Sequence, residues 1–215
     1  MIATPSLVQS LQAAPAFLLE SERLLLYTLV RSLRPRRILE IGVLHGGSTA
    51  IITRALDDNG EGTLWSVDPV PAITIDWNTV AHRATLYKGY SPDVLPEVAR
   101  AAGGCFDLCF IDANHAYGCV LKDAQGVMAY MARGGYLLFH DAHFREVKGA
   151  IDDFVATRIG VDDCGLLSTA EAGVDGNGEG PWGGLRLVRV RSNRGIAFPS
   201  ILSRGRRYLW NKLHA

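Results

Sequence analysis

Apolar positions follow two different spacings along most of this chain. Short apolar runs, typical of buried strands, are separated by stretches in which apolar residues recur every three or four positions, as on one face of a helix. Strands that alternate with helices in this way are typical of parallel sheets with helical crossovers. The pattern therefore predicts an α/β fold with a doubly wound, mostly parallel, Rossmann-like sheet.

The same pattern gives expected bounds for the elements. Strands are expected at 36–41, 63–67, 85–88, 106–111 and 136–140. Helices are expected at 47–57, 77–82, 92–101, 117–131 and 147–155. Gly134 and Gly135 are interpreted as the stop signal of the helix that reaches residue 131.

The two ends of the chain depart from this alternation. Residues 6–33 have helical spacing, and Pro15 is expected to divide them into two helices. Near the other end, 164–168 and 185–190 are strand-like, but the glycine-rich connection 169–184 has no helical pattern, which is typical of a lid or mobile segment. Neighbouring strands joined without a helix pair antiparallel. We therefore expect seven strands, the last of them antiparallel.

One domain accounts for the whole chain, 1–215. It comprises a helical N-terminal extension (1–34), a Rossmann-like core (35–192) and a basic C-terminal tail (193–215). The tail interleaves arginine with aromatic residues, and we expect it to be solvated or packed in a homodimer, with a membrane surface or an anionic substrate as the alternative.

Composition narrows the classes of partner and location. Acidic and basic side chains balance at 22 each, so no nucleic acid is expected as a partner. No apolar run approaches the length that spans a bilayer, and the N-terminus lacks a secretory leader pattern, so membrane insertion is not expected and the predicted location is cytoplasmic. The four cysteines lack zinc spacing, and three of them are expected to be buried and reduced.

A glycine loop between the first strand and the next helix is the first candidate site. Its glycines, Gly42, Gly46 and Gly47, match neither the Gly-x-Gly-x-x-Gly pattern of dinucleotide sites nor the Gly-Lys-Ser/Thr ending of a P-loop. Two interpretations stay open at this point. The loop either holds a nucleotide-like ligand without a pyrophosphate-binding motif, or it is a tight turn with no ligand.

Aspartates at three strand ends favour a ligand. Asp68, Asp112 and Asp141 each follow an apolar run, at the edge of an open sheet where ligands bind. An acid in the position of Asp68 can accept both hydroxyls of a ribose. A single such aspartate is often a helix cap, but three of them beside a glycine loop indicate a binding site.

These motifs resemble those of the class I S-adenosylmethionine-dependent methyltransferases, over roughly residues 36–190. The resemblance is to the small O-methyltransferase-like branch that includes cephalosporin hydroxylase-like proteins and macrolide sugar O-methyltransferases. The motifs that carry it are Glu40-Ile41-Gly42 with Gly46-Gly47-Ser48, Asp68, Gly89-Tyr90-Ser91, the segment 110–117, Gly134-Gly135 and His140-Asp141.

The resemblance implies how a cofactor is held. The first motif would bind the amino-acid end of S-adenosylmethionine, Asp68 the ribose, and Gly89 to Ser91 would lie beside the adenine. The implied cofactor-binding residues are Glu40, Gly42, Gly46, Gly47, Ser48, Asp68, Gly89, Ser91 and Asp112. The lack of a phosphate-binding loop agrees with this, because S-adenosylmethionine has no phosphates.

The resemblance also implies a catalytic pair and a metal site. His115 would be the general base and Asp112 would organise the acceptor. Asp112 and Asp141 resemble two ligands of a divalent-cation site, for which Mg²⁺ suits oxygen donors. Relatives supply a third ligand directly after the second aspartate, where this chain has Ala142. His143 or His140 would have to replace it, although imidazole favours a softer ion, so metal dependence stays open.

The resulting prediction is methyl transfer to a hydroxyl of a small molecule such as a sugar or secondary metabolite. One alternative is a nicotinamide-dependent oxidoreductase on a similar sheet, although the glycine spacing argues against it. The other is a non-catalytic module that binds S-adenosylmethionine.

Overall fold

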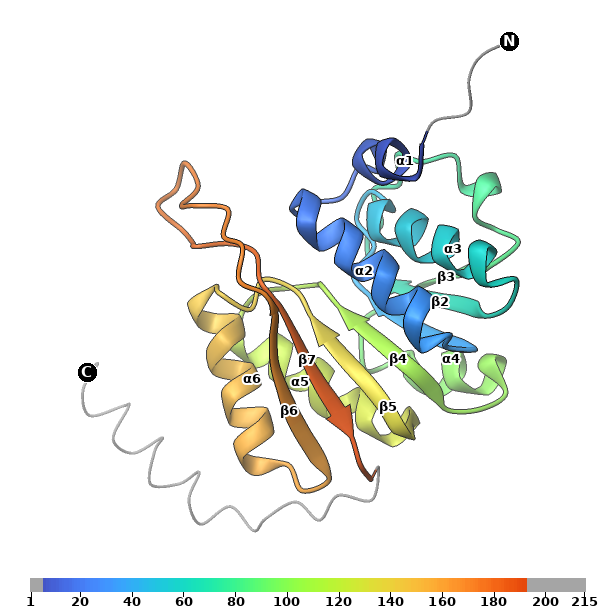
Figure 1. Cartoon of the computed structure of the whole chain (residues 1–215). Helices are drawn as coiled ribbons and strands as arrows, with labels where there is room; N and C mark the ends of the chain where they lie inside the picture. Colours follow the sequence, from blue (N-terminus) through green and yellow to red (C-terminus); the bar gives the residue numbers. More distant parts are fainter. Residues whose placement is uncertain (1–5, 193–215) are drawn as a thin grey trace, which may run out of the picture.

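A seven-stranded sheet lies between two layers of helices (Figure 1). The computed structural model describes residues 6–192, so the basic tail predicted from the sequence lies outside the described residues. The strands are β1 (Arg37–Ile41), β2 (Thr63–Asp68), β3 (Ala84–Lys88), β4 (Phe106–Ile111), β5 (Met131–Phe139), β6 (Val161–Ser168) and β7 (Leu185–Val190).

The strand order is β3-β2-β1-β4-β5-β7-β6. The first five strands pair in parallel, whereas β7 is antiparallel to both of its neighbours. The order reverses direction between β1 and β4, which is where open α/β sheets bind their ligands. The predicted doubly wound, mostly parallel sheet is confirmed.

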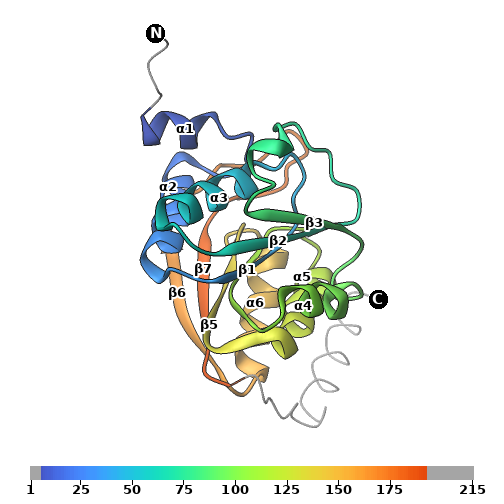
Figure 2. The same cartoon turned by 90° about the vertical axis from the view of Figure 1, so that its right-hand side faces the viewer.

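The helices divide between the two faces of the sheet. They are α1 (Leu7–Ala13), α2 (Glu20–Leu33), α3 (Gly47–Asn59), α4 (Leu95–Ala102), α5 (Tyr117–Val127) and α6 (Arg145–Thr157), with short 3₁₀ turns at Trp77–Thr79 and Met128–Tyr130. Figure 2 shows α1 to α3 on one side and α4 to α6 on the other. Within β4, Leu108 and Phe110 pack toward the first layer, while Cys109 and Ile111 pack toward the second.

The prediction for the region before β5 was wrong. The helix α5 ends at Val127, and Met131 already begins the strand, so Gly134 and Gly135 lie inside β5 and do not stop a helix. They form an irregularity against β4, where Phe106 pairs with Met131 but Leu108 pairs with Tyr136. A Cβ on Gly135 would lie 2.9 Å from the carbonyl oxygen of Asp107, so the close approach requires glycine.

Some element bounds also differ from those expected. The helix α4 begins at Leu95, three residues after Pro92, and β6 begins at Val161 and not at Cys164. The sequence signal for β6 is weak because β6 is an edge strand with exposed positions, and its polar start, Val161 to Asp163, lacks an apolar run.

The expected burial of three cysteines was wrong. Cys109 is the buried one, in the middle of β4, whereas Cys105, Cys119 and Cys164 are exposed. Cys105 lies in a loop, Cys119 in the first turn of α5 and Cys164 on the edge strand, so neighbouring apolar residues in the sequence do not cover them.

None of the helices between residues 6 and 192 is both long and apolar enough to cross a membrane.

Candidate active site

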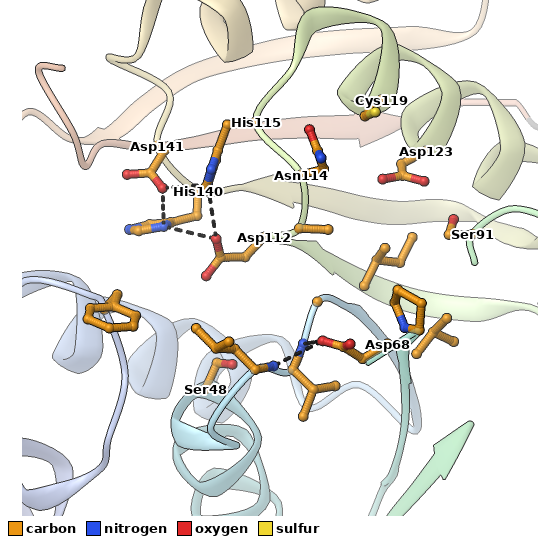
Figure 3. A pocket seen from close by; sticks show the side chains of 18 of the residues that line it. Ser48, Asp68, Ser91, Asp112, Asn114, His115, Cys119, Asp123, His140 and Asp141 are labelled. Atoms are coloured by element: carbon orange, nitrogen blue, oxygen red, sulfur yellow. Dashed lines mark hydrogen bonds and ion pairs between the residues drawn. The ribbon is translucent and has the colours of Figure 1, made fainter. Parts of the chain in front are cut away.

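A cavity of about 440 Å³ lies beyond the carboxyl ends of β1, β2 and β4, at the reversal of strand order (Figure 3). Most of the residues predicted from the sequence line it. They are Gly42, Gly47, Ser48, Asp68, Gly89, Ser91, Asp112, His115 and Asp141. Glu40, Gly46 and His143 do not line this cavity.

Gly42 permits the close approach of two strand ends. Its φ is +95°, and a Cβ there would lie 1.8 Å from the carbonyl oxygen of Asp112 and 2.9 Å from Cα of Ala113. Its amide donates a hydrogen bond to the carbonyl oxygen of Val67 (2.9 Å). The ends of β1, β2 and β4 therefore meet at a position that only glycine fits.

Asp68 orders the glycine loop from the end of β2. Its Oδ2 accepts hydrogen bonds from the amides of Val43 (2.9 Å) and Leu44 (3.0 Å), and its Oδ1 accepts one from Val70 (2.8 Å). Carboxylate oxygens have further acceptor capacity. Because Asp68 also lines the cavity, it can hold the loop and accept hydroxyl groups of a ligand at the same time.

Glu40 lies beneath the glycine loop and is fully buried. Its carboxylate accepts hydrogen bonds from the hydroxyls of Ser48 (2.6 Å), Thr49 (2.7 Å) and Ser66 (2.6 Å). Burial raises the pKa of Glu40, and these three hydroxyls oppose that rise. Glu40 thus fixes the first turn of α3 to β1 and β2, and it reaches the cavity only through Ser48.

Two carboxylates and two imidazoles form a cluster at one end of the cavity. His115 Nε2 lies 2.9 Å from Asp141 Oδ2 and 3.8 Å from Asp112 Oδ1. His140 Nδ1 lies 3.1 Å from Asp141 Oδ2 and 3.3 Å from Asp112 Oδ1 (Figure 3). Asp141 adopts a left-handed backbone conformation (φ 52°), which directs its carboxylate into this cluster and is uncommon for a residue other than glycine.

The cluster shifts the pKa values of its members. Burial lowers the pKa of His115, but Asp112 and Asp141 outweigh it and raise that pKa to about 9. The pKa of His140 also lies well above its usual value, because Asp112, Asp141 and Glu22 outweigh its burial. Burial raises the pKa of Asp112, but His140 and His115 lower it to about 2. In the absence of another cation, the His115 imidazole is therefore protonated at neutral pH.

Glu22, on α2, was not predicted from the sequence. Its Oε2 lies 3.1 Å from His140 Nε2 and accepts a hydrogen bond from the Leu19 amide, while its Oε1 accepts one from Gly184 (2.6 Å). His140 is 118 residues away along the chain and Gly184 is 162 residues away. No local pattern signals such contacts, so only the fold shows that α2 supports the cluster.

The glycine-rich connection 169–184 returns to the same site. The amide of Gly183 donates a hydrogen bond to Asp141 Oδ1 (2.6 Å). Trp182 stacks on Phe144, with ring centroids 4.4 Å apart and planes at 9°, and meets His115 edge-on at 5.2 Å. An aromatic wall therefore stands beside the predicted base.

Three residues of the cluster could hold a metal ion. One ligand atom each from Asp112, His115 and Asp141 lies within 4.8 Å of the others. The structure does not bring His143 into this group; its ring lies against Gly184, where a Cβ would be 2.6 Å from His143 Cδ2. His115 is thus the nitrogen that the geometry offers in place of the ligand missing at Ala142.

The segment between α1 and α2 forms the remaining wall. Pro15, Ala16, Phe17 and Leu18 line the cavity, and a Cβ on Gly47 would lie 2.3 Å from the Ala16 amide nitrogen. The guanidinium of Arg23 donates hydrogen bonds to the carbonyl oxygens of Leu11, Gln12, Ala14, Ala16 and Leu18. The Arg23 side chain therefore holds this segment in place. The sequence alone did not indicate this role of Arg23.

Comparison with known proteins finds similarity to methyltransferases. Residues 39–142 match the family model described as a methyltransferase domain. A catechol O-methyltransferase from Niastella koreensis is 33% identical over 93 residues, which are 41% of this chain and 42% of that protein. The matched segment thus spans less than half the length of that relative.

Two solved structures share the fold across most of the chain. The O-methyltransferase TomG from Streptomyces achromogenes, involved in tomaymycin synthesis and solved in complex with S-adenosylmethionine, has a TM-score of 0.65 at 21% identity, covering 89% of this chain and 93% of its own. An O-methyltransferase from Bacillus cereus in complex with S-adenosylhomocysteine has a TM-score of 0.66 at 19% identity, covering 88% and 93%. Residues 39–142 thus match a methyltransferase domain, and the chain shares the fold of solved S-adenosylmethionine-dependent O-methyltransferases.

Proposed function

We propose that the protein transfers a methyl group from S-adenosylmethionine to a hydroxyl of a small molecule. The observation that carries this proposal is one cavity in which the glycine loop and Asp68 face the cluster of Asp112, His115 and Asp141. Its relatives support the proposal, since one is named a catechol O-methyltransferase and two others are O-methyltransferases bound to this cofactor or its product.

The cavity fits a nucleoside that lacks phosphates. Asp68 offers carboxylate oxygens for the ribose hydroxyls, and the first turn of α3 with Ser48 lies where the amino-acid end would bind. Carboxylates on the cavity wall also suit the positive charge of a sulfonium. Methyl transfer then requires the acceptor oxygen to lie in line with the methyl carbon, and positioning alone lowers much of such a barrier.

Proton removal is the task we propose for His115. It lines the cavity, and its ring also contacts Phe144 and Trp182, which are not among the cavity-lining residues. With Asp112 and Asp141 both ionised, however, the raised pKa of His115 keeps its proton at neutral pH. The base role therefore needs either alkaline pH or a cation that offsets the two carboxylates.

A divalent cation is the second part of this proposal. Asp112 and Asp141 offer hard oxygens of the kind that Mg²⁺ binds, and His115 completes a group of three. Such an ion would supply Lewis-acid stabilisation of the acceptor oxygen when bound. His115 cannot be a ligand through Nε2 and the base through Nε2 at once, so the two roles give different results in the tests below.

The pH dependence of kcat/KM is expected to differ with and without Mg²⁺. After chelation, activity should rise with pH along a limb near 9, because His115 must lose its proton before it can act as a base. Added Mg²⁺ should move that limb to lower pH, because a cation at Asp112 and Asp141 opposes protonation of the imidazole. Profiles measured on chelated and Mg²⁺-loaded protein check this. Full activity of chelated protein at neutral pH would contradict the metal proposal.

Transfer of label from S-adenosylmethionine tests the reaction itself. With the methyl group labelled, the protein is incubated with a panel of catechols and of sugars with neighbouring hydroxyls, and the products are analysed for labelled methyl ethers. A labelled ether that forms only with protein supports the proposal. Binding of S-adenosylhomocysteine without transfer to any acceptor would favour a non-catalytic module.

A further inference from the structure

The neutral net charge of the chain conceals a separation of charge along the sequence. All 22 acidic residues lie before residue 193, whereas five of the 22 basic residues follow it. These five are Arg194, Arg204, Arg206, Arg207 and Lys212. Residues 1–192 therefore contain 17 basic and 22 acidic residues, a net charge of −5, and residues 193–215 carry +5.

The basic segment 193–215 also contains large apolar residues. Phe198, Tyr208 and Trp210 alternate with isoleucine, leucine and arginine. Arginine mixed with aromatic and aliphatic residues is typical of sequences that bind at the interface of a membrane.

The structure places an arginine-rich edge of the sheet where this segment begins. Because β7 is antiparallel to β5, it ends at the edge where β4 and β5 begin (Figure 1). This amino edge lies opposite the carboxyl ends of the strands, where the cavity is. Five arginines lie along it, at the end of α2, the starts of β1 and β5, and the end of β7. They are Arg34, Arg36, Arg133, Arg189 and Arg191.

Two acidic side chains at the amino edge pair with part of this charge. Glu61 lies 2.9 Å from Arg34 and 3.8 Å from Arg36, and Asp162 lies 3.0 Å from Arg191. The Arg36 side chain is nevertheless 79% exposed. Exposed ion pairs of this kind contribute little to stability, so these arginines can exchange partners at small cost.

The middle of the amino edge keeps its positive charge. Arg133 and Arg189 are exposed, and neither forms an ion pair with a side chain between residues 6 and 192. They lie close together, because Arg189 pairs with Tyr136, three residues after Arg133. The nearest carboxylate along the edge, that of Asp107, accepts hydrogen bonds from two backbone amides at the start of β1.

We propose that the amino edge of the sheet, continued by residues 193–215, is a docking surface for a membrane that contains anionic lipids. Arginine pairs with lipid phosphates and carboxylates, and the apolar residues of the final segment match the acyl boundary, which a nucleic acid does not offer. Because residues 1–192 are acidic as a whole, an anionic surface attracts this edge in preference to the others. The cavity at the opposite edge then opens away from the lipid.

Sedimentation with vesicles tests the docking surface. The full-length protein is mixed with vesicles of phosphatidylcholine alone or with about 30% phosphatidylserine. Binding is expected only to the anionic vesicles, and salt should weaken it by screening. The double variant Arg133→Glu with Arg189→Glu should bind at least about 25-fold more weakly, because each basic residue near such a surface contributes about fivefold.

The double variant Arg145→Glu with Lys148→Glu is the matched control, since it changes the net charge by the same amount. Both residues are exposed at the start of α6, which follows the carboxyl end of β5. A strand of six residues separates the two edges by roughly 20 Å, beyond the screening length at about 0.1 M salt. Vesicle binding should therefore change less than about twofold.

Three results would overturn the inference. Equal binding of the wild type to neutral and anionic vesicles would do so, as would tighter binding of the wild type to a DNA duplex than to either vesicle; neither needs a folded variant. Equal effects of the two double variants would exclude this edge. The proposed function is tested separately, since the Arg133→Glu, Arg189→Glu protein should keep wild-type affinity for S-adenosylhomocysteine, which also shows that it is folded.

Discussion

Gly42→Ala is expected to destabilise the protein and to abolish tight cofactor binding. The new Cβ would lie 1.8 Å from the carbonyl oxygen of Asp112, and this neighbour is backbone that cannot rotate away. Overpacking and the left-handed φ of +95° together should lower the free energy of unfolding by about 2–4 kcal/mol. Because relief of the clash moves the loop, the affinity for S-adenosylhomocysteine should fall at least about tenfold.

Gly60→Ala is the control that separates strain from collision. Gly60 also has a left-handed φ, +76°, but no heavy atom lies within 4 Å of a Cβ there. Gly60→Ala should lower the free energy of unfolding by only about 1–2 kcal/mol and leave the affinity for S-adenosylhomocysteine unchanged. Urea unfolding and calorimetry on both variants measure the two quantities. A Gly42→Ala protein with wild-type affinity would contradict the close approach of the β1 and β4 ends.

His115→Ala is expected to lower kcat by about 10²- to 10⁴-fold, the usual range for loss of a general base. Affinity for S-adenosylhomocysteine should change little, because His115 is assigned to the acceptor and not to the methyl donor. His82→Ala is the matched control, since His82 Nε2 also lies beside a carboxylate (2.8 Å from Asp57 Oδ1) but is exposed and outside the cavity. A methylated product formed at the wild-type rate by His115→Ala would refute the base assignment.

The same variant separates the two roles of His115. If His115 acts as the base, Mg²⁺ affinity should survive its removal, because Asp112 and Asp141 remain. If it is instead a metal ligand, Mg²⁺ affinity should fall along with kcat. Titration of the variant with Mg²⁺ in the presence of S-adenosylhomocysteine measures this directly.

The parts of the fold that were predictable depend on local pattern. The strand ends at Gly42, Asp68, Asp112 and Asp141 follow from apolar runs, and parallel strands bring their carboxyl ends to one edge of the sheet. The start of β5 was not predictable in the same way. Met131 continues the helical spacing of α5, and the irregular pairing around Gly135 depends on contact with β4.

The supporting contacts of the site were beyond local pattern altogether. Glu22 reaches His140 from a helix 118 residues earlier, and Trp182 reaches His115 from the far end of an irregular connection. Asp123 occupies a position of α5 that spacing alone assigns to a polar helix residue. Only the structure shows that Asp123 is buried and lines the cavity. Motifs thus predicted the candidate reacting groups, whereas tertiary packing decides which side chains support them.

Calorimetric titration with S-adenosylhomocysteine tests the central claim most directly, because it needs no knowledge of the methyl acceptor. We expect saturable binding of one ligand per chain, with no comparable binding of NADH, since the glycine loop offers no pyrophosphate grip. A protein that binds NADH tightly and gives no heat with S-adenosylhomocysteine would contradict the assignment of this cavity to the methyl donor.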